Sequence, residues 1–431
     1  MESDGGNKSA LFNPWVQLAV GVIAMACVAN LQYGWTLFVN PIDAKYGWGR
    51  AEIQVAFTLF VLIETWLIPV ETWFVDKYGP RWVVAGGAVL VAMAWAINSM
   101  ANSLALLYVG AILGGVGTGC VYGTCVGNAL KWFPGRRGLA AGITASGFGA
   151  GAAVTIIPIS NMIKSSGYEQ TFLFFGLLQG AIVLTMSALM RKAPAHLAAA
   201  AKARPSQSAR DYTPAEVLRT PVFWVMYSMF VLIAIGGLTF AASIAPYAKD
   251  LKVDAIPVHL LGTVLPAVTF AISLNRIFDG VGRPFFGWLS DQIGREHTMF
   301  IAFSIGAAAL FVWNNWGSTP VVFVLASAVY FGVYGEIFSL FPATQGDTFG
   351  SKYAATNAGM LYTAKGTAAL AVPFASALAT SSGWTTVFTL AMTFNILAAL
   401  MAIFVMKPMR ARHLAASREA VFQSAAQTTL A

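Results

Sequence analysis

About twelve long apolar stretches run through the chain, and they constrain its fold more than any other feature. A helix needs about 20 mainly apolar residues to cross about 30 Å of hydrocarbon. Backbone polar groups in lipid must be satisfied within the segment itself, so spans of this length are helices. The sequence predicts an all-α integral membrane protein with 12 transmembrane helices. They lie near residues 14–39, 52–75, 81–100, 104–130, 137–162, 170–190, 221–247, 259–290, 297–314, 319–342, 353–380 and 384–406.

The composition agrees with a membrane protein. The 431 residues are 57% hydrophobic and 10% charged, whereas a soluble domain carries roughly 25% charged residues. The three cysteines fall within predicted spans, which argues against a disulfide framework. The four histidines are scattered over separate segments. We therefore expect no metal site and no cofactor.

The net charge of +8 is best explained by orientation in the membrane. If the amino terminus lies inside, most Lys and Arg residues fall in the tails and the even-numbered loops. This bias fits the positive-inside rule. It predicts a multi-pass protein of the inner or plasma membrane with both termini cytoplasmic, and it argues against nucleic acid as a partner.

The longest polar connection, residues 191–220, predicts a cytoplasmic linker with a short surface helix near "TPAEVLR". It divides the chain into two six-helix halves, residues 14–190 and 221–406. Residues 1–13 and 407–431 are predicted to be cytoplasmic tails.

The halves contain a weak internal repeat. "FVDKYGPR" after the second span matches "WLSDQIGR" after the eighth, and "WFPGRRGLAAG" before the fifth matches "TFGSKYAATNAG" before the eleventh. Both offsets are about 215 residues, as expected for an internal duplication. Two parallel, pseudo-symmetric halves predict a rocking transporter with its site between the halves.

Ionisable residues within the spans indicate function. Arg276, Asp279 and Arg283 are spaced i, i+3 and i+7, which places them on one helix face. A charge near the bilayer centre costs about 2.5–3.5 kcal/mol when it faces lipid. Such groups must face a cavity, pair or change protonation. A fixed structural ion pair between Arg276 and Asp279 is one reading.

Other spans carry such groups at a similar depth. Counting about 1.5 Å per residue places Glu64, Asp279, Glu336 and Lys365 roughly 16–18 Å from the ends of their spans. A structural role for Glu64 is equally open. Arg283 and Lys365 lie in different spans of the second half and can face one cavity. Two cations at one depth predict an anion site.

Polar and aromatic residues at mid-span positions of both halves could line this site. Tyrosine and glutamine donate hydrogen bonds to a carboxylate, and aromatic rings exclude water. The candidate lining residues are Gln32, Tyr33, Gln54, Tyr122, Phe148, Tyr334, Phe338 and Tyr362.

The Asp-x-x-Gly turns that precede an arginine after the second and eighth spans resemble the signature of the major facilitator superfamily. In that superfamily this loop makes charge and helix-end contacts that lock one conformation. The resemblance implies a gating role for Asp76, Arg81, Asp291 and Arg295.

Several stretches resemble the oxalate:formate antiporter family within that superfamily. They are "LQYGWTLFVNP", "VYGTCVGNALKWFPGRRGLAAG", "GRPFFGWLSDQIGR", "LFPATQGDTFG" and the Lys365 span. The resemblance implies that Arg283 and Lys365 hold the carboxylates of the anion beneath aromatic residues. Phe148 and Phe338 stand where the oxalate exchanger has tyrosines.

One residue departs from the family pattern. Asp279 lies four residues before Arg283, where the oxalate exchanger carries asparagine. Asp-x-x-x-Arg in the eighth span instead resembles the proton-coupled monocarboxylate transporters. A protonatable partner of the binding arginine implies proton symport, with Glu64 and Glu336 as further candidate proton sites.

These observations predict a secondary active transporter of small carboxylate anions that works by alternating access, as a monomer in the lipid bilayer. Oxalate:formate-type exchange is the first reading, and proton-coupled symport of a lactate- or pyruvate-like monocarboxylate is the alternative. The spans show no nucleophile–base arrangement or histidine cluster, so we do not expect an enzyme.

Overall fold

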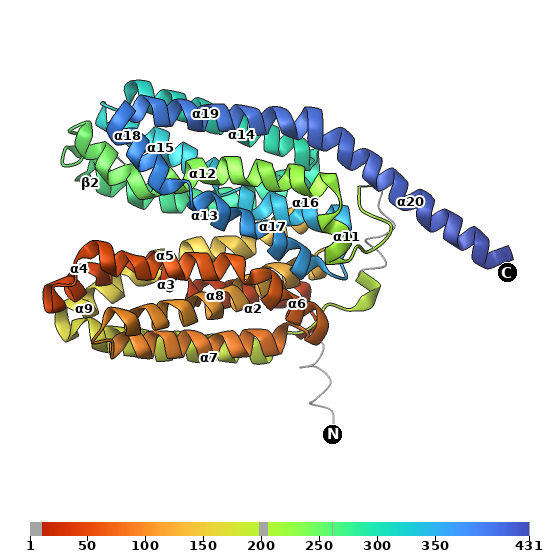
Figure 1. Cartoon of the computed structure of the whole chain (residues 1–431), viewed down its shortest axis with the longest axis horizontal. Coiled ribbons are helices and arrows are strands. Elements are labelled where there is room, and N and C mark those ends of the chain that lie inside the picture. Colours follow the sequence, from red (N-terminus) through yellow and green to blue (C-terminus); the bar gives the residue numbers. More distant parts are fainter. Residues whose placement is uncertain (1–10, 198–205, 261, 431) are drawn as a thin grey trace. The chain divides into compact units, whose positions relative to one another are not determined.

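The computed structural model describes residues 11–197, 206–260 and 262–430, and the described chain is almost entirely helical (Figure 1). Before the linker the helices are α2 (Pro14–Val28), α3 (Asn30–Tyr33), α4 (Thr36–Tyr46), α5 (Arg50–Trp66), α6 (Ile68–Tyr78), α7 (Pro80–Ser99), α8 (Leu104–Trp132) and α9 (Arg137–Leu189). The linker carries α11 (Pro214–Leu218). After it follow α12 (Pro221–Asp250), β1 (Pro257–Leu260), β2 (Thr263–Pro266), α13 (Ala267–Ile293), α14 (Arg295–Trp316), α15 (Pro320–Tyr334), α16 (Ile337–Phe349), α17 (Ala354–Ala369), α18 (Val372–Ser382), α19 (Trp384–Met401), the π-helical turn η1 (Ala402–Met406) and α20 (Lys407–Leu430).

The predicted spans correspond to these helices, although several are broken. Among the described residues, 8 helices are long and apolar enough to cross a membrane, and the bent pair α5–α6 makes a ninth. Spans five and six both lie within α9, which is interrupted at Gly167 (φ 83°). Span eleven is divided into α17 and α18, and span ten into α15 and α16. Span eight, α13, carries several charged residues.

The predicted start of span eight was wrong. Residues 257–266 form an antiparallel hairpin, with Pro257 opposite Pro266 and Leu260 opposite Thr263, and α13 begins only at Ala267. The apolar run misled the prediction because the hairpin is itself rich in valine and leucine. Proline has no N–H and a fixed φ, so Pro266 can end the strand and precede the helix.

The described chain packs as two compact units. Among the described residues, unit 1 comprises 11–134, 143–197 and 351–363, and unit 2 comprises 135–142, 206–260, 262–350 and 364–430. In unit 1, α8 packs against α7, α5 and α2. In unit 2, α15 packs against α13 and α14, and α14 also packs against α19. The segments 135–142 and 351–363 therefore pack with the opposite part of the chain from the one that their sequence positions suggest.

Glycines allow the helices of unit 2 to approach closely. A Cβ added to Gly282 on α13 would lie 1.9 Å from the backbone oxygen of Gly332 on α15. Small residues at such crossings let helix backbones touch. This crossing fixes the rotation of α13, and with it the direction of the neighbouring Arg283.

The two Asp-x-x-Gly turns share one backbone conformation. Gly79 has φ 92° and Gly294 has φ 94°, a region that favours glycine. The arginines differ, because Arg81 comes two residues after Gly79 whereas Arg295 follows Gly294 directly. The backbone conformation of the turn is therefore repeated in the two halves, whereas the position of the arginine after the glycine is not.

Residues 206–220 of the linker pack with unit 2, whereas residues 191–197 belong to unit 1. The backbone N–H groups of Ser208 and Tyr212 donate to the carbonyl oxygens of Asp347 (2.8 Å) and Phe349 (2.9 Å). The predicted surface helix is confirmed as α11, whose first turn carries a capping box formed by Thr213 and Glu216. Residues 198–205 of the predicted linker lie outside the described residues.

Candidate functional site

A buried ion pair lies on α13. Nη2 of Arg283 is 2.7 Å from Oδ2 of Asp279, and Nε donates to Oδ1 at 3.3 Å. The side chains are only 2% and 4% exposed, so the pair is removed from water. Arg276 is half-buried on the same helix. The structure thus pairs Asp279 with Arg283, the partner expected for a proton-linked anion site.

An aromatic ring covers the guanidinium of Arg283. The Phe338 ring centroid lies 4.6 Å from Cζ of Arg283, within the range of a cation–π contact. Phe338 in turn makes an edge contact with Tyr334, with centroids 5.8 Å apart. Two predicted lining residues therefore lie beside the predicted binding arginine.

Glu336 lies at the break between α15 and α16. The residue is fully buried, and neither carboxylate oxygen has a hydrogen-bond partner among the described residues. An ionised carboxylate without a partner is costly in such a setting. This geometry suits a group that takes up and releases a proton.

Lys365 and Tyr362 lie on α17, on either side of the boundary between the units. Lys365 is 3% exposed and belongs to unit 2, which also contains Arg283, Phe338 and Tyr334. Tyr362 belongs to unit 1. Both predicted cations are therefore buried within the same unit.

Unit 1 contains a second group of predicted lining residues. The ring centroids of Tyr122 and Tyr362 lie 4.6 Å apart, and those of Tyr122 and Phe148 lie 5.3 Å apart. Tyr33 makes an edge contact with Phe148 at 5.4 Å. The fold thus gathers four aromatic residues from distant spans into one cluster.

The remaining predicted residues of unit 1 have different surroundings. Gln32 is buried, whereas Gln54 is exposed on α5. Glu64 is fully buried near the end of α5, and α6 continues from there with a bend of 42°. Glu71 lies beyond this bend, on α6, and is close enough to Glu64 to be affected by its negative charge.

The two predicted gating aspartates each bind the start of another helix. Asp76 forms an ion pair with Lys131 and accepts hydrogen bonds from the backbone N–H (2.9 Å) and the Oγ1 hydroxyl (2.6 Å) of Thr356, in the first turn of α17. Asp291 accepts from the backbone N–H groups of Gly138 (3.1 Å) and Leu139 (2.9 Å), in the first turn of α9. A helix amino terminus attracts negative charge, so both contacts are favourable.

The two predicted gating arginines behave differently. Arg295 is buried and binds both Asp291 (2.6 Å) and Asp347 (2.9 Å). Arg81 is exposed and lies over the Trp82 ring, 5.4 Å from its centroid. The one-residue difference in spacing after the glycine accounts for this, because it turns Arg81 to another side of its helix.

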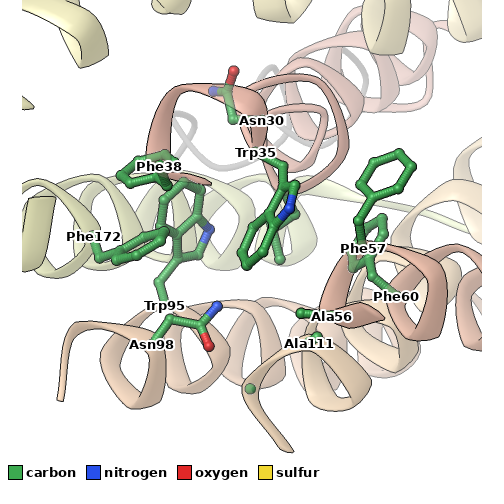
Figure 2. A pocket seen from close by; sticks show the side chains of 12 residues that line it. Asn30, Trp35, Phe38, Ala56, Phe57, Phe60, Trp95, Asn98, Ala111 and Phe172 are labelled. Carbon is green, nitrogen blue, oxygen red and sulfur yellow. The ribbon is translucent and has the colours of Figure 1, made fainter. Parts of the chain in front are cut away.

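A small cavity in unit 1 lies among Trp35, Trp95, Asn30 and Asn98 (Figure 2). Its volume is about 20 Å³, enough for one water molecule. Both indole N–H groups, the Asn30 amide nitrogen and the Asn98 amide oxygen have no hydrogen-bond partner among the described residues. The cavity therefore has the size and the polar groups to hold one water molecule, and it is too small for a dicarboxylate.

Comparison with known proteins identifies the family. The chain matches the Major Facilitator Superfamily over residues 20–373 and 259–429. It is 34% identical to the oxalate:formate antiporter of Oxalobacter formigenes over 407 residues, which span 94% of each chain. The chain belongs to this superfamily, and within it to the oxalate:formate antiporter family.

Further similarities are weaker. The monocarboxylate transporter 12-B of Danio rerio is 24% identical over 65% of this chain and 63% of its own. The crystal structure of the fucose:proton symporter of Escherichia coli shares the fold, with a TM-score of 0.65, 15% identity, and coverage of 91% of this chain and 98% of that one. The superfamily fold predicted from the sequence is confirmed, and the chain is a membrane transporter, not an enzyme.

Several partners of the predicted gating residues were not identified from the sequence. Lys131, Thr356 and Asp347 complete the ion pairs and hydrogen bonds of the two Asp-x-x-Gly turns. Asp347 also binds Arg137 (2.8 Å). The repeated segments before spans five and eleven were the available signal, because they contain Arg137 and Thr356 and begin the helices that the two aspartates contact.

Proposed function

We propose that this transporter carries small carboxylate anions and that Arg283 and Lys365 bind the carboxylate groups. The buried Arg283–Asp279 pair beneath the Phe338 ring is the observation that carries this proposal. Charged residues inside a membrane protein are costly and mark substrate or proton pathways. Arginine suits a carboxylate because its planar fork of N–H groups matches two oxygens at once.

Exchange of oxalate for formate, or of related anions, is the first candidate function. Its support is the relative named for that exchange, which aligns with nearly the whole chain. In this mechanism the anion on one side replaces the anion on the other, and Arg283 always holds a carboxylate while the carrier changes conformation. The aromatic residues Tyr33, Tyr122, Tyr334 and Tyr362, with Gln32 and Gln54, would contact the anion.

Proton-coupled monocarboxylate symport is the second candidate, and the contact between Asp279 and Arg283 favours it. Protonation of Asp279 would break the ion pair and free Arg283 for a carboxylate. Release of the anion would let the pair re-form and expel the proton. Glu336 and Glu64 are further candidate proton carriers.

The wider mechanism follows the superfamily. We propose alternating access by the six-helix halves, with Asp76, Asp291 and Arg295 stabilising one conformation and Arg81 contributing less. We also propose a cell-membrane location with both termini cytoplasmic, and function as a monomer.

Purified protein in proteoliposomes tests both candidates. Exchange predicts uptake of labelled oxalate only when oxalate or formate is preloaded inside. Symport predicts uptake of labelled lactate or pyruvate driven by an imposed pH gradient without preloading. If labelled oxalate does not enter preloaded vesicles, and neither lactate nor pyruvate enters in response to a pH gradient, the carboxylate proposal fails.

The variant Asp279→Asn separates the two candidates further. It keeps the shape of the side chain but cannot cycle a proton. Exchange predicts retained oxalate counterflow, and symport predicts loss of pH-driven uptake.

A further inference from the structure

Gly335 lies at the break between α15 and α16, directly against the pair formed by Asp279 and Arg283. A Cβ added to Gly335 would lie 2.3 Å from Oδ1 of Asp279, 2.8 Å from the backbone oxygen of Asp279 and 3.1 Å from Cγ of Arg283. Gly335 is buried, and all three residues belong to unit 2. The break therefore approaches the ion pair so closely that it leaves no room for a side chain.

The close approach, and not the backbone conformation, is what requires glycine at this position. Gly335 has φ −59° and ψ −19°, a conformation that any residue adopts readily. Its N–H donates to the carbonyl oxygen of Phe331 (3.2 Å), as in an ordinary last helical turn. The cost of a side chain at residue 335 would therefore come from α13, which carries Asp279 and Arg283.

The carboxylate oxygen next to Gly335 makes the longer of two hydrogen bonds in the pair. Oδ1 of Asp279 accepts from Nε of Arg283 at 3.3 Å, whereas Oδ2 accepts from Nη2 at 2.7 Å. A methyl group on residue 335 would push Oδ1 and so break the Nε contact first. Nε and Nη2 form one edge of the guanidinium, and an arginine edge of this kind can bind two carboxylate oxygens at once. Asp279 therefore occupies donors that suit a substrate carboxylate.

Gly335 also takes part in placing the ring that covers Arg283. The backbone N–H of Phe338 donates to the carbonyl oxygen of Gly335 (3.2 Å) where α16 begins. The Phe338 ring centroid lies 4.6 Å from Cζ of Arg283. One residue thus connects two contacts of the guanidinium, the carboxylate of Asp279 and the ring of Phe338.

We infer that Gly335 is a positioning residue that keeps Asp279 against Arg283 and thereby sets how strongly Asp279 competes with the substrate anion for the guanidinium. The inference rests on the proposed role of Arg283 in binding a carboxylate. With glycine at residue 335, Asp279 reaches both Nε and Nη2, and an anion must displace it to gain the same donors. A side chain at residue 335 pushes Asp279 aside, weakens the pair and favours the anion.

Equilibrium binding of labelled oxalate and of labelled lactate to the purified full-length protein tests this competition. Gly335→Ala should bind the anion about threefold to tenfold more tightly than the wild type, because the competing pair loses a hydrogen bond between charged groups. In the Asp279→Asn background the competing charge is absent, so the added Gly335→Ala should change the affinity less than about twofold. Val329→Ile adds a methyl group on the exposed face of α15 and should bind like the wild type.

The comparison of backgrounds separates this role from a purely structural one. A shift of α13 or α15 that merely distorts the site would change the affinity alike with Asp279 and with Asp279→Asn. Equal changes in the two backgrounds, or weaker binding by Gly335→Ala, would overturn the inference.

Thermal unfolding in the absence of anion tests the same contact when neither anion binds the wild type, a result that would overturn the proposed function alone. Gly335→Ala should lower the unfolding midpoint by about 2–4 °C, because Arg283 pins Asp279 and prevents it from swinging aside. In the double variant Asp279→Asn, Arg283→Gln the neutral side chains rotate away more easily, so the added methyl group should cost clearly less.

The same comparison covers a failure of Gly335→Ala to fold. Folded protein in the neutral background but not in the wild-type background would support the inference. Equal losses of midpoint in the two backgrounds, or no folded protein in either, would overturn it.

Discussion

Asp76 accepts a 2.9 Å hydrogen bond from the backbone N–H of Thr356, a residue 280 positions further along the chain. Asp291 makes the matching contact with the backbone N–H of Leu139, also at 2.9 Å. Each aspartate lies in the last turn of one helix and binds the first turn of another. The internal repeat therefore preserves a contact as well as a sequence pattern.

The first prediction concerns this contact. Asp76→Asn keeps a hydrogen-bond acceptor but loses the charge that binds Lys131 and attracts the start of α17. Because the Asp76 side chain is only 4% exposed, we expect a loss of about 1–3 kcal/mol of stability. A thermal unfolding curve of the detergent-solubilised protein measures it.

The matched control is Asp250→Asn. Asp250 accepts from the Trp384 indole (2.7 Å) at an exposed position, so its replacement should leave the midpoint nearly unchanged. If both variants shifted the unfolding midpoint equally, the contact of Asp76 with Lys131 and Thr356 would not contribute specially to stability.

The second prediction concerns Arg283. Arg283→Gln should abolish anion uptake, whereas Arg283→Lys should retain the charge, lose the two-pronged contact and lower kcat/KM by about 10–100-fold. Initial rates of labelled anion uptake in proteoliposomes measure both effects. Arg283→Gln also leaves Asp279 buried without its partner, which can destabilise the protein by about 3–5 kcal/mol.

The double variant Asp279→Asn, Arg283→Gln removes both charges and controls for this cost. It should reach the membrane at the wild-type level and still fail to transport. Saturable uptake by the double variant would show that Arg283 does not bind the anion.

Lys365 provides the third prediction. Lys365→Gln should reduce uptake by at least about 100-fold, since a buried cation that binds a carboxylate contributes about 3 kcal/mol. Lys352→Gln removes an exposed lysine shortly before the same helix and should leave uptake unchanged. If Lys365→Gln only lowered the amount of folded protein, with normal uptake per molecule, a structural role would be the better explanation.

The sequence predicted the membrane fold well because long apolar runs leave few alternatives. It also singled out Asp279 and Arg283, since three charges within one apolar run must be accommodated. It did not predict the broken helices, because Leu67 and Gly335 interrupt spans without changing their hydropathy. The hairpin at 257–266 was missed for the same reason.

The partners of the site residues were harder to predict. Arg276 and Arg283 are both within one turn of Asp279 on a helix, and only the packing of α13 on α15 decides which arginine pairs with it. Thr356 is neutral and distant in sequence, and only its place in the repeated segment before span eleven connected it with the Asp-x-x-Gly turns. Contacts of this kind depend on tertiary structure rather than on local pattern.

The docked linker leads to the fourth prediction. The backbone N–H and the hydroxyl of Thr213 donate to the Glu216 carboxylate, and these hydrogen bonds lower the pKa of Glu216 below its ordinary value. A lowered pKa in the folded state means that the capping box stabilises α11 above the unfolded pKa of about 4.3. This contribution is lost as the pH falls through the folded pKa.

Hydrogen exchange of the amides of residues 215–218, measured from about pH 3 to pH 7 and corrected for the intrinsic rate, tests it. Protection should decrease at the acidic end in the wild type. Glu216→Gln should show lower protection at pH 7 and little further change on acidification. A wild-type profile that is flat over this range would contradict the prediction.

The fifth prediction concerns the crossing of α13 and α15. Gly282→Ala places a methyl group where the backbone oxygen of Gly332 lies, and a backbone cannot move aside as a flexible side chain can. We expect a loss of about 1–3 kcal/mol and a shift of the helix that carries Arg283, with reduced uptake per folded molecule. Gly86→Ala adds the same methyl group where no atom lies within 4 Å, so it should leave both the unfolding midpoint and uptake unchanged. If Gly282→Ala matched Gly86→Ala in both measurements, the close approach of the two backbones would not be what holds α13 in place.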